Sequence, residues 1–410
     1  MIYFDNAATS FPKAPGVSEA MAKFITHDAA NPGRAGHRMA VAAERMLDDV
    51  RLKLTRLFNG ASPHRMIFAM NCTDALNMAI KGVVSELAPG NGSLPHVITT
   101  VLEHNSVSRP LAAMAAQGRI ELTRVDCDAR GIIDPDDIRQ AITPATAMIV
   151  MSHASNVLGT IQDAQAVGGL AREHDLLFLL DAAQTAGVCP IDIQAMHIDM
   201  LALPGHKSLL GPTGTGALYV GERCPEPAEA VAATHEAGQL NEAITRRGRL
   251  SPWREGGTGG DSTTPTQPPL YPYYLEGGTP NTVGIVGLGT ALDYLAEGDL
   301  AHTLAHEQAM CQRLIDALAD DDRFVIFGPG DASKCVGTLS VNVRDLEPGD
   351  VGSILDDSFD IAVRPGLHCA PYTHRRLKTF PSGTLRISPG RFNTDEQLDQ
   401  LLDALGQIAE

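Results

Sequence analysis

Apolar residues along the first half of the chain follow two alternating patterns. Helical spacing occurs over 39–57 and 76–87 and in segments near 106–117, 134–141 and 162–174. Short continuous apolar runs lie at 66–70, 97–101, 120–125, 147–151, 176–180 and 200–203. A period of 3.6 residues indicates an amphipathic helix, and a short apolar run indicates a buried strand. Strands that alternate with helices predict an α/β fold with a mostly parallel sheet covered on both faces.

The pattern changes in the second half of the chain. The segment 251–284 holds many of the Gly and Pro residues, which predicts an ordered loop or linker. Helical patterning returns over 285–320, short strands are expected at 324–327 and 337–343, and a last helix is expected at 394–408. This half therefore predicts a smaller α+β unit, with a domain boundary near residue 284.

The charge balance and the cysteine pattern limit which partners and which cellular location the sequence predicts. The 410-residue chain has a formal net charge of −17, because 49 acidic residues outnumber 32 basic ones. This balance argues against a nucleic-acid partner, since phosphate backbones need clustered Lys and Arg. No apolar run approaches the roughly 20 residues that span a bilayer, and the first residues lack a signal-peptide pattern. Seven widely spaced cysteines without a metal-like cluster then favour a cytoplasmic location.

Asp181 and Lys207 form the first pair that could carry chemistry. Asp181 follows the apolar run 176–180, and ligands in open α/β sheets bind beyond the carboxyl ends of the strands. A carboxylate there could keep a pyridine nitrogen protonated, and a nearby lysine could form a Schiff base, as pyridoxal phosphate enzymes require. The alternative is structural, with Asp181 capping the next helix and Lys207 solvated.

Two polar turns follow strands in the same topological position. The turn 71–77 opens a helix, whose free N–H groups and positive dipole end suit a phosphate. A plain N-cap by Thr73 or Asp74 is the alternative. His104 lies in the second turn, where an imidazole could stack on a flat cofactor ring or shuttle protons as a catalytic residue. The alternative is a structural role only.

The third candidate group surrounds Cys369, which lies in a Gly-containing loop after Arg364 and beside His368. Both neighbours could lower the pKa of the thiol and favour a thiolate. Arg386, in an apolar run, could grip a carboxylate through two hydrogen bonds. The alternative for Cys369 is a buried, inert thiol, as expected for most of the other six cysteines.

These motifs, in this order, resemble the class V aminotransferases of fold type I, specifically the cysteine desulfurase and selenocysteine lyase group. The matching segments run nearly from end to end and include Tyr3-Phe-Asp-Asn-Ala-Ala-Thr9, Asn31-Pro-Gly-Arg-Ala-Gly-His37, Glu103-His-Asn-Ser106, Ser155-Asn-Val-Leu-Gly-Thr160, Asp181-Ala-Ala-Gln184, Gly205-His-Lys207, Gly211-Pro-Thr-Gly-Thr-Gly216, Gly256-Gly-Thr-Gly259, Gly277-Gly-Thr-Pro-Asn281 and Leu367-His-Cys369 with Arg386. The resemblance implies a large domain with a seven-stranded sheet that binds pyridoxal 5'-phosphate, and a smaller C-terminal α+β domain. It divides the chain into an N-terminal arm (1–14) packing with the small domain, a large domain (15–284) with an insertion at about 224–254, and a small domain (285–410).

The family's roles then fall on matching residues. The resemblance implies that Lys207 bonds to the cofactor and moves the Cα proton, that Asp181 pairs with the pyridine nitrogen, and that Cys369 attacks the substrate sulfur. It also implies that His104 stacks on the cofactor ring and that Gln184 contacts its phenolic oxygen. Asn156 would lie near that oxygen and near the substrate carboxylate, which Arg386 would bind. The implied phosphate-binding residues are Thr73 with Asp74 beside it, His206, and Thr258 from the second subunit of a homodimer.

The implied reaction converts L-cysteine to L-alanine and leaves a persulfide on Cys369 for transfer to a sulfur-acceptor protein. Two other readings stay open. One is a selenocysteine lyase or another C–S lyase, in which Cys369 is dispensable. The other is a sulfur-carrier or interaction protein without significant catalysis. The chain departs from the family pattern at Pro204, at the insertion 224–254 and at Leu367.

Overall fold

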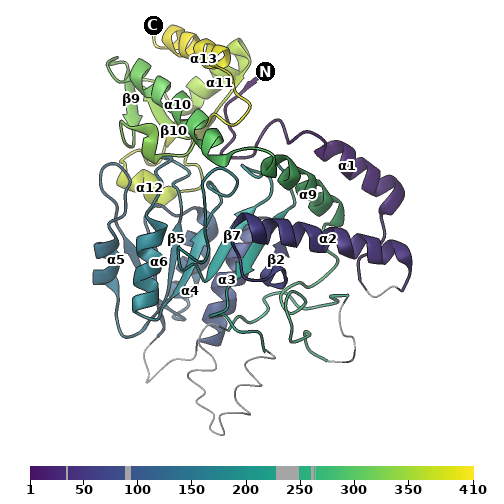
Figure 1. Cartoon of the computed structure of the whole chain (residues 1–410). Coiled ribbons are helices and arrows are strands. Elements are labelled where there is room, and N and C mark those ends of the chain that lie inside the picture. The colour runs from purple at the N-terminus through teal and green to yellow at the C-terminus, as the bar shows by residue number, and fades with distance from the viewer. Residues whose placement is uncertain (34–35, 88–93, 228–248, 260–262, 264) are drawn as a thin grey trace.

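A seven-stranded sheet lies at the centre of the larger unit in this computed structural model, which describes residues 1–33, 36–87, 94–227, 249–259, 263 and 265–410 (Figure 1). In spatial order the strands are β2 (Met66–Ala69), β8 (Gly216–Val220), β7 (Met200–Pro204), β6 (Leu177–Asp181), β5 (Thr146–Ser152), β3 (His96–Thr100) and β4 (Glu121–Val125). Strand β8 runs antiparallel to both β2 and β7, and the other neighbouring strands are parallel to each other. The mostly parallel α/β sheet is therefore confirmed, and β8 is a strand that the apolar pattern did not single out.

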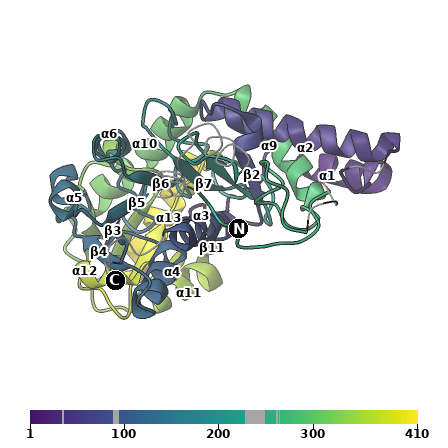
Figure 2. The ribbon, with the colours of Figure 1, turned by 90° about the horizontal axis from the view of Figure 1, so that it is seen from below.

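Helices cover both faces of this sheet, as both views of the ribbon show (Figures 1 and 2). They are α1 (Val17–Lys23), the π-helix η1 (Phe24–Asp28), α2 (Arg38–Leu57), the 3-10 helix η2 (Pro63–Arg65), α3 (Cys72–Glu86), α4 (Asn105–Ala116), α5 (Pro135–Ala141), α6 (Ala164–Glu173) and α9 (Thr282–Ala296). Consecutive strand residues enter opposite cores: Phe178 packs in the core with α2, α6 and α9, and Leu179 in the core with α3 and α4. Burial on both faces explains why the strands read as continuous apolar runs.

A second, smaller unit stands at the C-terminal side, above the sheet in Figure 1. Its antiparallel sheet has the order β12 (Arg364–Gly366), β13 (Thr384–Ile387), β10 (Leu339–Val343) and β9 (Phe324–Phe327). The other elements are α10 (Leu300–Leu318), the 3-10 helix η3 (Ala332–Lys334), α11 (Pro348–Phe359), β11 (Ile361–Ala362), α12 (Pro371–Arg376) and α13 (Asp395–Ile408). The expected strand at 324–327 and the last helix are confirmed.

The N-terminal arm joins the two units. Strand β1 (Ile2–Tyr3) pairs in parallel with β11, and Phe4 is fully buried in the core of the smaller unit. Further along, the Ser10 N–H donates to the His206 carbonyl oxygen at 3.1 Å, beside the large sheet. The arm therefore crosses directly over the carboxyl ends of the central strands.

The helical pattern expected over 285–320 is confirmed. The chain forms two helices, α9 and α10, separated at Glu297–Asp299. Asp299 caps α10 by accepting from the Ala301 N–H, and Gly298 lies between the two helices, so the sequence supplies its own break. Because the buried face of α9 packs in the core of the large sheet, we propose moving the domain boundary from 284 to this turn.

Two other expectations concern the chain between the units. Within the described part of 251–281 no helix or strand forms, in agreement with the predicted loop. The insertion expected at 224–254 lies mostly outside the described residues.

No described helix has both the length and the apolar character that a membrane crossing demands.

Helix α6 provides a matched pair of glycines that tests how tightly the sheet is covered. A Cβ on Gly168 would lie 1.9 Å from the Met196 carbonyl oxygen, whereas a Cβ on neighbouring Gly169 would meet nothing within 4 Å. We expect Gly168→Ala to lower the free energy of unfolding by about 1–3 kcal/mol, since the backbone must shift. Gly169→Ala should leave it unchanged or raise it by about 0.5–1 kcal/mol. Urea unfolding of both variants measures the difference, and equal midpoints would contradict this packing.

Candidate active site

A cavity of about 210 Å³ opens at the carboxyl ends of the central strands, where the arm and the smaller unit meet the sheet. Ser152 ends β5, Asp181 ends β6 and Pro204 ends β7, and all three line the cavity. Eight of the residues expected at the site also line it: Thr73, His104, Asn156, Asp181, Gln184, His206, Lys207 and Arg386. Ligand binding at this edge is the rule for open α/β sheets.

Asp181 and Lys207 lie at the buried floor of the cavity. The Asp181 carboxylate accepts from the Ala183 N–H at 2.9 Å and from the Cys72 thiol at 3.4 Å, and burial raises its pKa. Burial, followed by the charge of Arg386, lowers the pKa of Lys207 to about 8. The lowered pKa makes a larger share of this amine neutral, and so nucleophilic, near neutral pH than for an ordinary lysine.

His104 and His206 are neutral imidazoles. His104 caps α4 by accepting from the Ser106 N–H at 3.1 Å, and burial followed by the Lys207 charge lowers its pKa to about 4. His206 Nδ1 lies 3.0 Å from Thr9 Oγ1, and burial lowers its pKa to about 4 as well. Neither ring adds positive charge to the cavity.

Of the residues expected to bind the phosphate, Thr73 and His206 line the cavity, whereas Asp74 and Thr258 do not. Thr73 stands at the N-terminus of α3, and its Oγ1 lies 2.7 Å from Ser106 Oγ, a cavity-lining hydroxyl that the sequence reading missed. Pro204 also lines the cavity and offers neither a hydroxyl nor an N–H. The N-terminus of a 15-residue helix and two hydroxyls still form a cradle for an anion.

Asp74 and Thr258 do not line this cavity. Asp74 Oδ2 accepts from the Met70 N–H at 2.9 Å and pairs with Arg254 at 3.4 Å, so the alternative of a structural role at the helix N-terminus describes it better. Thr258 lines a different cavity, of about 720 Å³, that also contains Arg51. A role for Thr258 at the active site would need a second copy of the chain.

Arg386 is the most constrained cation of the site. It is 1% exposed. Its Nη2 donates to Asp5 Oδ1 at 2.7 Å, and its Nη1 donates to the Asn156 carbonyl oxygen at 3.1 Å. Its Nε and the Asn156 side-chain oxygen are buried without a hydrogen-bond partner among the described residues. Both residues line the cavity, so the site holds unsatisfied polar groups that a ligand can complete.

Cys369 is half-buried, whereas the other six cysteines are buried. Its carbonyl oxygen accepts from the Asn105 N–H at 2.7 Å, and Arg364 Nη2 lies 3.7 Å from its Sγ. His368 and Cys369 both have left-handed backbones, with φ of 48° and 58°, so the loop turns sharply here. Arg364 also lines the cavity, which places the thiol one side chain away from it.

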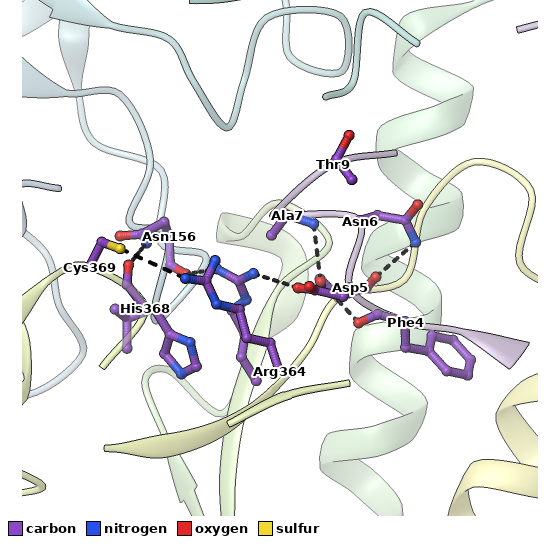
Figure 3. A network of polar contacts seen from close by, with 12 residues as sticks. Phe4, Asp5, Asn6, Ala7, Thr9, Asn156, Arg364, His368 and Cys369 are labelled. Carbon is purple, nitrogen blue, oxygen red and sulfur yellow. Dashed lines mark hydrogen bonds and ion pairs between the residues drawn. The ribbon is translucent and has the colours of Figure 1, made fainter. Parts of the chain in front are cut away.

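The expectation that His368 helps to deprotonate Cys369 is wrong. Its ring points away from the sulfur, and Nε2 lies 3.1 Å from the Thr384 carbonyl oxygen and 3.1 Å from Thr384 Oγ1 (Figure 3). Burial and the charge of Arg386 lower the pKa of His368 to about 2, which keeps the ring neutral. Arg364 remains as the group beside the thiol.

Comparison with known proteins agrees with this geometry. The family model for class-V aminotransferases matches residues 2–401. The chain belongs to this family, whose enzymes use pyridoxal phosphate. Two curated relatives are a probable cysteine desulfurase of Methanothermobacter thermautotrophicus (31% identical, covering 100% of this chain and 94% of the relative) and cysteine desulfurase IscS of Photobacterium profundum (32%, covering 100% and 93%).

Solved structures give the same picture. The apo cysteine desulfurase of Thermococcus onnurineus superposes with a TM-score of 0.87 at 28% identity, covering 100% of this chain and 94% of that one. The cysteine desulfurase CsdA of Escherichia coli has a TM-score of 0.82 at 28% identity, covering 99% and 94%. The predicted fold class and family are confirmed.

The cavity fits pyridoxal phosphate. Its floor offers an amine and a carboxylate, and one wall offers the hydroxyls and helix N-terminus described above. Gln184 lies in the same cavity, with its Nε2 donating to the Ala7 carbonyl oxygen at 3.2 Å. Lys207, Asp181, Gln184, His104 and Thr73 would hold the cofactor, as the sequence predicts.

The low pKa of Lys207 predicts a specific pH dependence of cofactor uptake. A lysine with a pKa of about 8 is protonated below that pH and neutral above it. The rate at which the apoprotein takes up pyridoxal phosphate should therefore rise with pH and level off just above pH 8. It can be followed by the visible absorbance of the bound cofactor. Free Nα-acetyl-lysine serves as the control and should keep gaining rate toward its pKa of about 10.4. A protein profile that tracks this control would contradict a desolvated Lys207.

Proposed function

We propose that this protein is a pyridoxal-phosphate-dependent cysteine desulfurase that forms L-alanine from L-cysteine and carries the sulfur on Cys369. The observation that supports this most directly is the position of that thiol. It is half-buried and 3.7 Å from Arg364, whose side chain lines the same cavity as Lys207 and Arg386. A transaminase would have no use for a thiol at this place.

Each residue at the cavity would have a separate role in the reaction. Arg386 binds the substrate carboxylate, with its unpartnered Nε as an available donor. When bound, the cofactor withdraws electrons from the substrate Cα and so makes the Cα proton removable. Lys207, a base with a pKa of about 8, takes up and returns that proton. Asp181 lies on the cavity floor to keep the cofactor's pyridine nitrogen protonated.

The sulfur step needs only the Cys369 thiolate. Its Sγ attacks the substrate Sγ and forms an S–S bond while the substrate C–S bond breaks. The electron pair of the broken bond stays with the three-carbon skeleton, which takes up a proton and leaves as alanine. L-cysteine and a thiol thus become L-alanine and a persulfide, with no external oxidant or reductant. Arg364 stabilises the negative charge on the sulfur before and after transfer.

The same proposal covers assembly and location. A homodimer would bring Thr258 of a second copy toward the cavity, as the family resemblance implies. A reducing cytoplasm is consistent with seven cysteines that are all free thiols. The persulfide would then pass to a sulfur-acceptor protein.

The test is alanine release by the wild type and by Cys369→Ala, with L-cysteine and L-selenocysteine as parallel substrates and dithiothreitol present. We expect the variant to lose at least about 100-fold of its activity on cysteine, since a catalytic nucleophile is removed. Its activity on selenocysteine should persist, because selenide leaves without help from a thiol. Cys127→Ala, which removes a buried thiol outside the cavity, should change neither activity.

Other results would favour the competing functions. If Cys369→Ala is as active on cysteine as the wild type, the protein is a selenocysteine lyase or another C–S lyase. If the wild type binds the cofactor and forms no alanine from either substrate, the carrier function replaces the proposal.

A further inference from the structure

The segment that carries Cys369 has an unusual charge. Residues 361–394 contain six basic residues and no acidic one, although the chain as a whole has 49 acidic residues and a net charge of −17. A stretch of this length would hold about four acidic residues at the average composition of the chain. The basic residues are Arg364, Arg375, Arg376, Lys378, Arg386 and Arg391.

Some of these basic side chains already have partners within the protein. Arg386 is paired with Asp5, and Arg364 is at the thiol. Arg376 donates to Asp126 at 2.8 Å and to the Cys127 carbonyl oxygen. Arg375 and Lys378 are exposed, and within the described part of the chain neither has a carboxylate within ion-pair distance.

Arg109 is a further exposed cation, on a helix whose first residue contacts the Cys369 loop. It is exposed on α4, one turn beyond Asn105, whose N–H donates to the Cys369 carbonyl oxygen. Its charge also contributes to the low pKa of His104 at the cavity. Helix α12 follows Cys369 directly and is fastened beside this region, because Thr373 donates to the Val101 carbonyl oxygen at 3.0 Å. We call Arg109, Arg375 and Lys378 the cationic rim.

An aromatic side chain completes the rim. Phe380 is 45% exposed, and Arg375 lies over its ring at 4.8 Å from the centroid. Arginine and exposed aromatic residues are the types that most often dominate protein–protein interfaces. The rim therefore combines charge with an apolar contact at the loop that holds the nucleophile.

We propose that the cationic rim docks an acidic protein whose cysteine accepts the sulfur from Cys369. This inference rests on the proposed function. A chain of net charge −17 repels acidic proteins at long range, and a local positive rim reverses that field where transfer takes place. The amino-acid substrate needs no such rim, because its carboxylate is bound inside the cavity by Arg386. A nucleic acid fits less well, since three exposed cations on an acidic protein neutralise too few phosphates.

The transfer itself balances without a further reagent. The acceptor thiolate attacks the outer sulfur of the Cys369 persulfide and forms a new S–S bond. The bond between that sulfur and Cys369 Sγ breaks, and Cys369 leaves as a thiolate beside Arg364.

Synthetic acceptor peptides test the proposal on the holoenzyme. Three peptides would each carry one cysteine, flanked by Asp and Glu, by Ser and Gly, or by Lys. With ³⁵S-labelled L-cysteine, we expect transfer to the acidic peptide to be at least about 5-fold faster than to the neutral one at low salt. The advantage should vanish in about 0.5 M NaCl, where charges are screened within a few ångströms.

Two charge-reversal variants locate the effect. Arg375→Glu with Lys378→Glu should abolish the preference for the acidic peptide and keep alanine formation with dithiothreitol. Arg45→Glu with Arg56→Glu changes the net charge equally at exposed positions on α2, which lies across the molecule from α12 in both ribbon views, and should keep the preference (Figures 1 and 2). No preference in the wild type, or a preference unchanged by the rim variant, would overturn the proposal.

Competition by RNA and the alanine assay distinguish a nucleic-acid partner from a failure of the proposed function. If single-stranded RNA competes with the acidic peptide at lower concentration than the same peptide with serine for cysteine, the rim serves nucleic acid and the proposal fails. If no alanine forms with dithiothreitol, the proposed function fails instead. Fluorescence anisotropy of the labelled acidic peptide then still decides whether the rim binds acidic protein segments.

Discussion

The buried guanidinium of Arg386 is the contact on which the arrangement of the site depends. It belongs to β13 of the smaller unit, it pairs with Asp5 of the N-terminal arm, and it donates to the carbonyl oxygen of Asn156 beyond β5 of the large sheet. Three distant parts of the chain thus meet at one side chain that is 1% exposed. A buried cation without partners is costly, so the arm and both units must assemble before the cavity is complete.

The same cation sets the electrostatics around it. Its charge follows burial as a cause of the low pKa values of Lys207 and His368. Neutral imidazoles and a lysine whose pKa is lowered to about 8 then face a substrate that brings its own carboxylate. Two arginines, Arg386 and Arg364, carry the fixed positive charge of the cavity, whereas the lowered pKa of Lys207 lets its amine gain and lose a proton near pH 8. Binding an anion and moving a proton require this division.

The α/β fold and the positions of site residues at strand ends could be predicted from the sequence, because regular strands fix where their last residues lie. Asp181 ends an uninterrupted apolar strand, so its place at the edge of the sheet followed from the pattern, and it shares a cavity with Lys207 as expected. The orientation of His368 could not be predicted, since neighbours in a loop with positive φ point in different directions. Asp74 shows a related ambiguity, because residues at a helix N-terminus can serve a ligand or the backbone. Its contacts with the Met70 N–H and with Arg254 agree with the structural alternative.

The neutral state of His368 has a consequence for the nucleophile. No imidazole or carboxylate is hydrogen-bonded to the Cys369 thiol within the described chain, and Arg364 Nη2 lies 3.7 Å from its sulfur. Full burial would oppose a thiolate, because burial raises the pKa of a thiol, as it does for Cys72 and Cys224. Partial exposure beside Arg364 is therefore the condition for a thiolate here. That exposure also leaves the sulfur open to an acceptor, so one feature of the loop serves both the formation of the persulfide and its release.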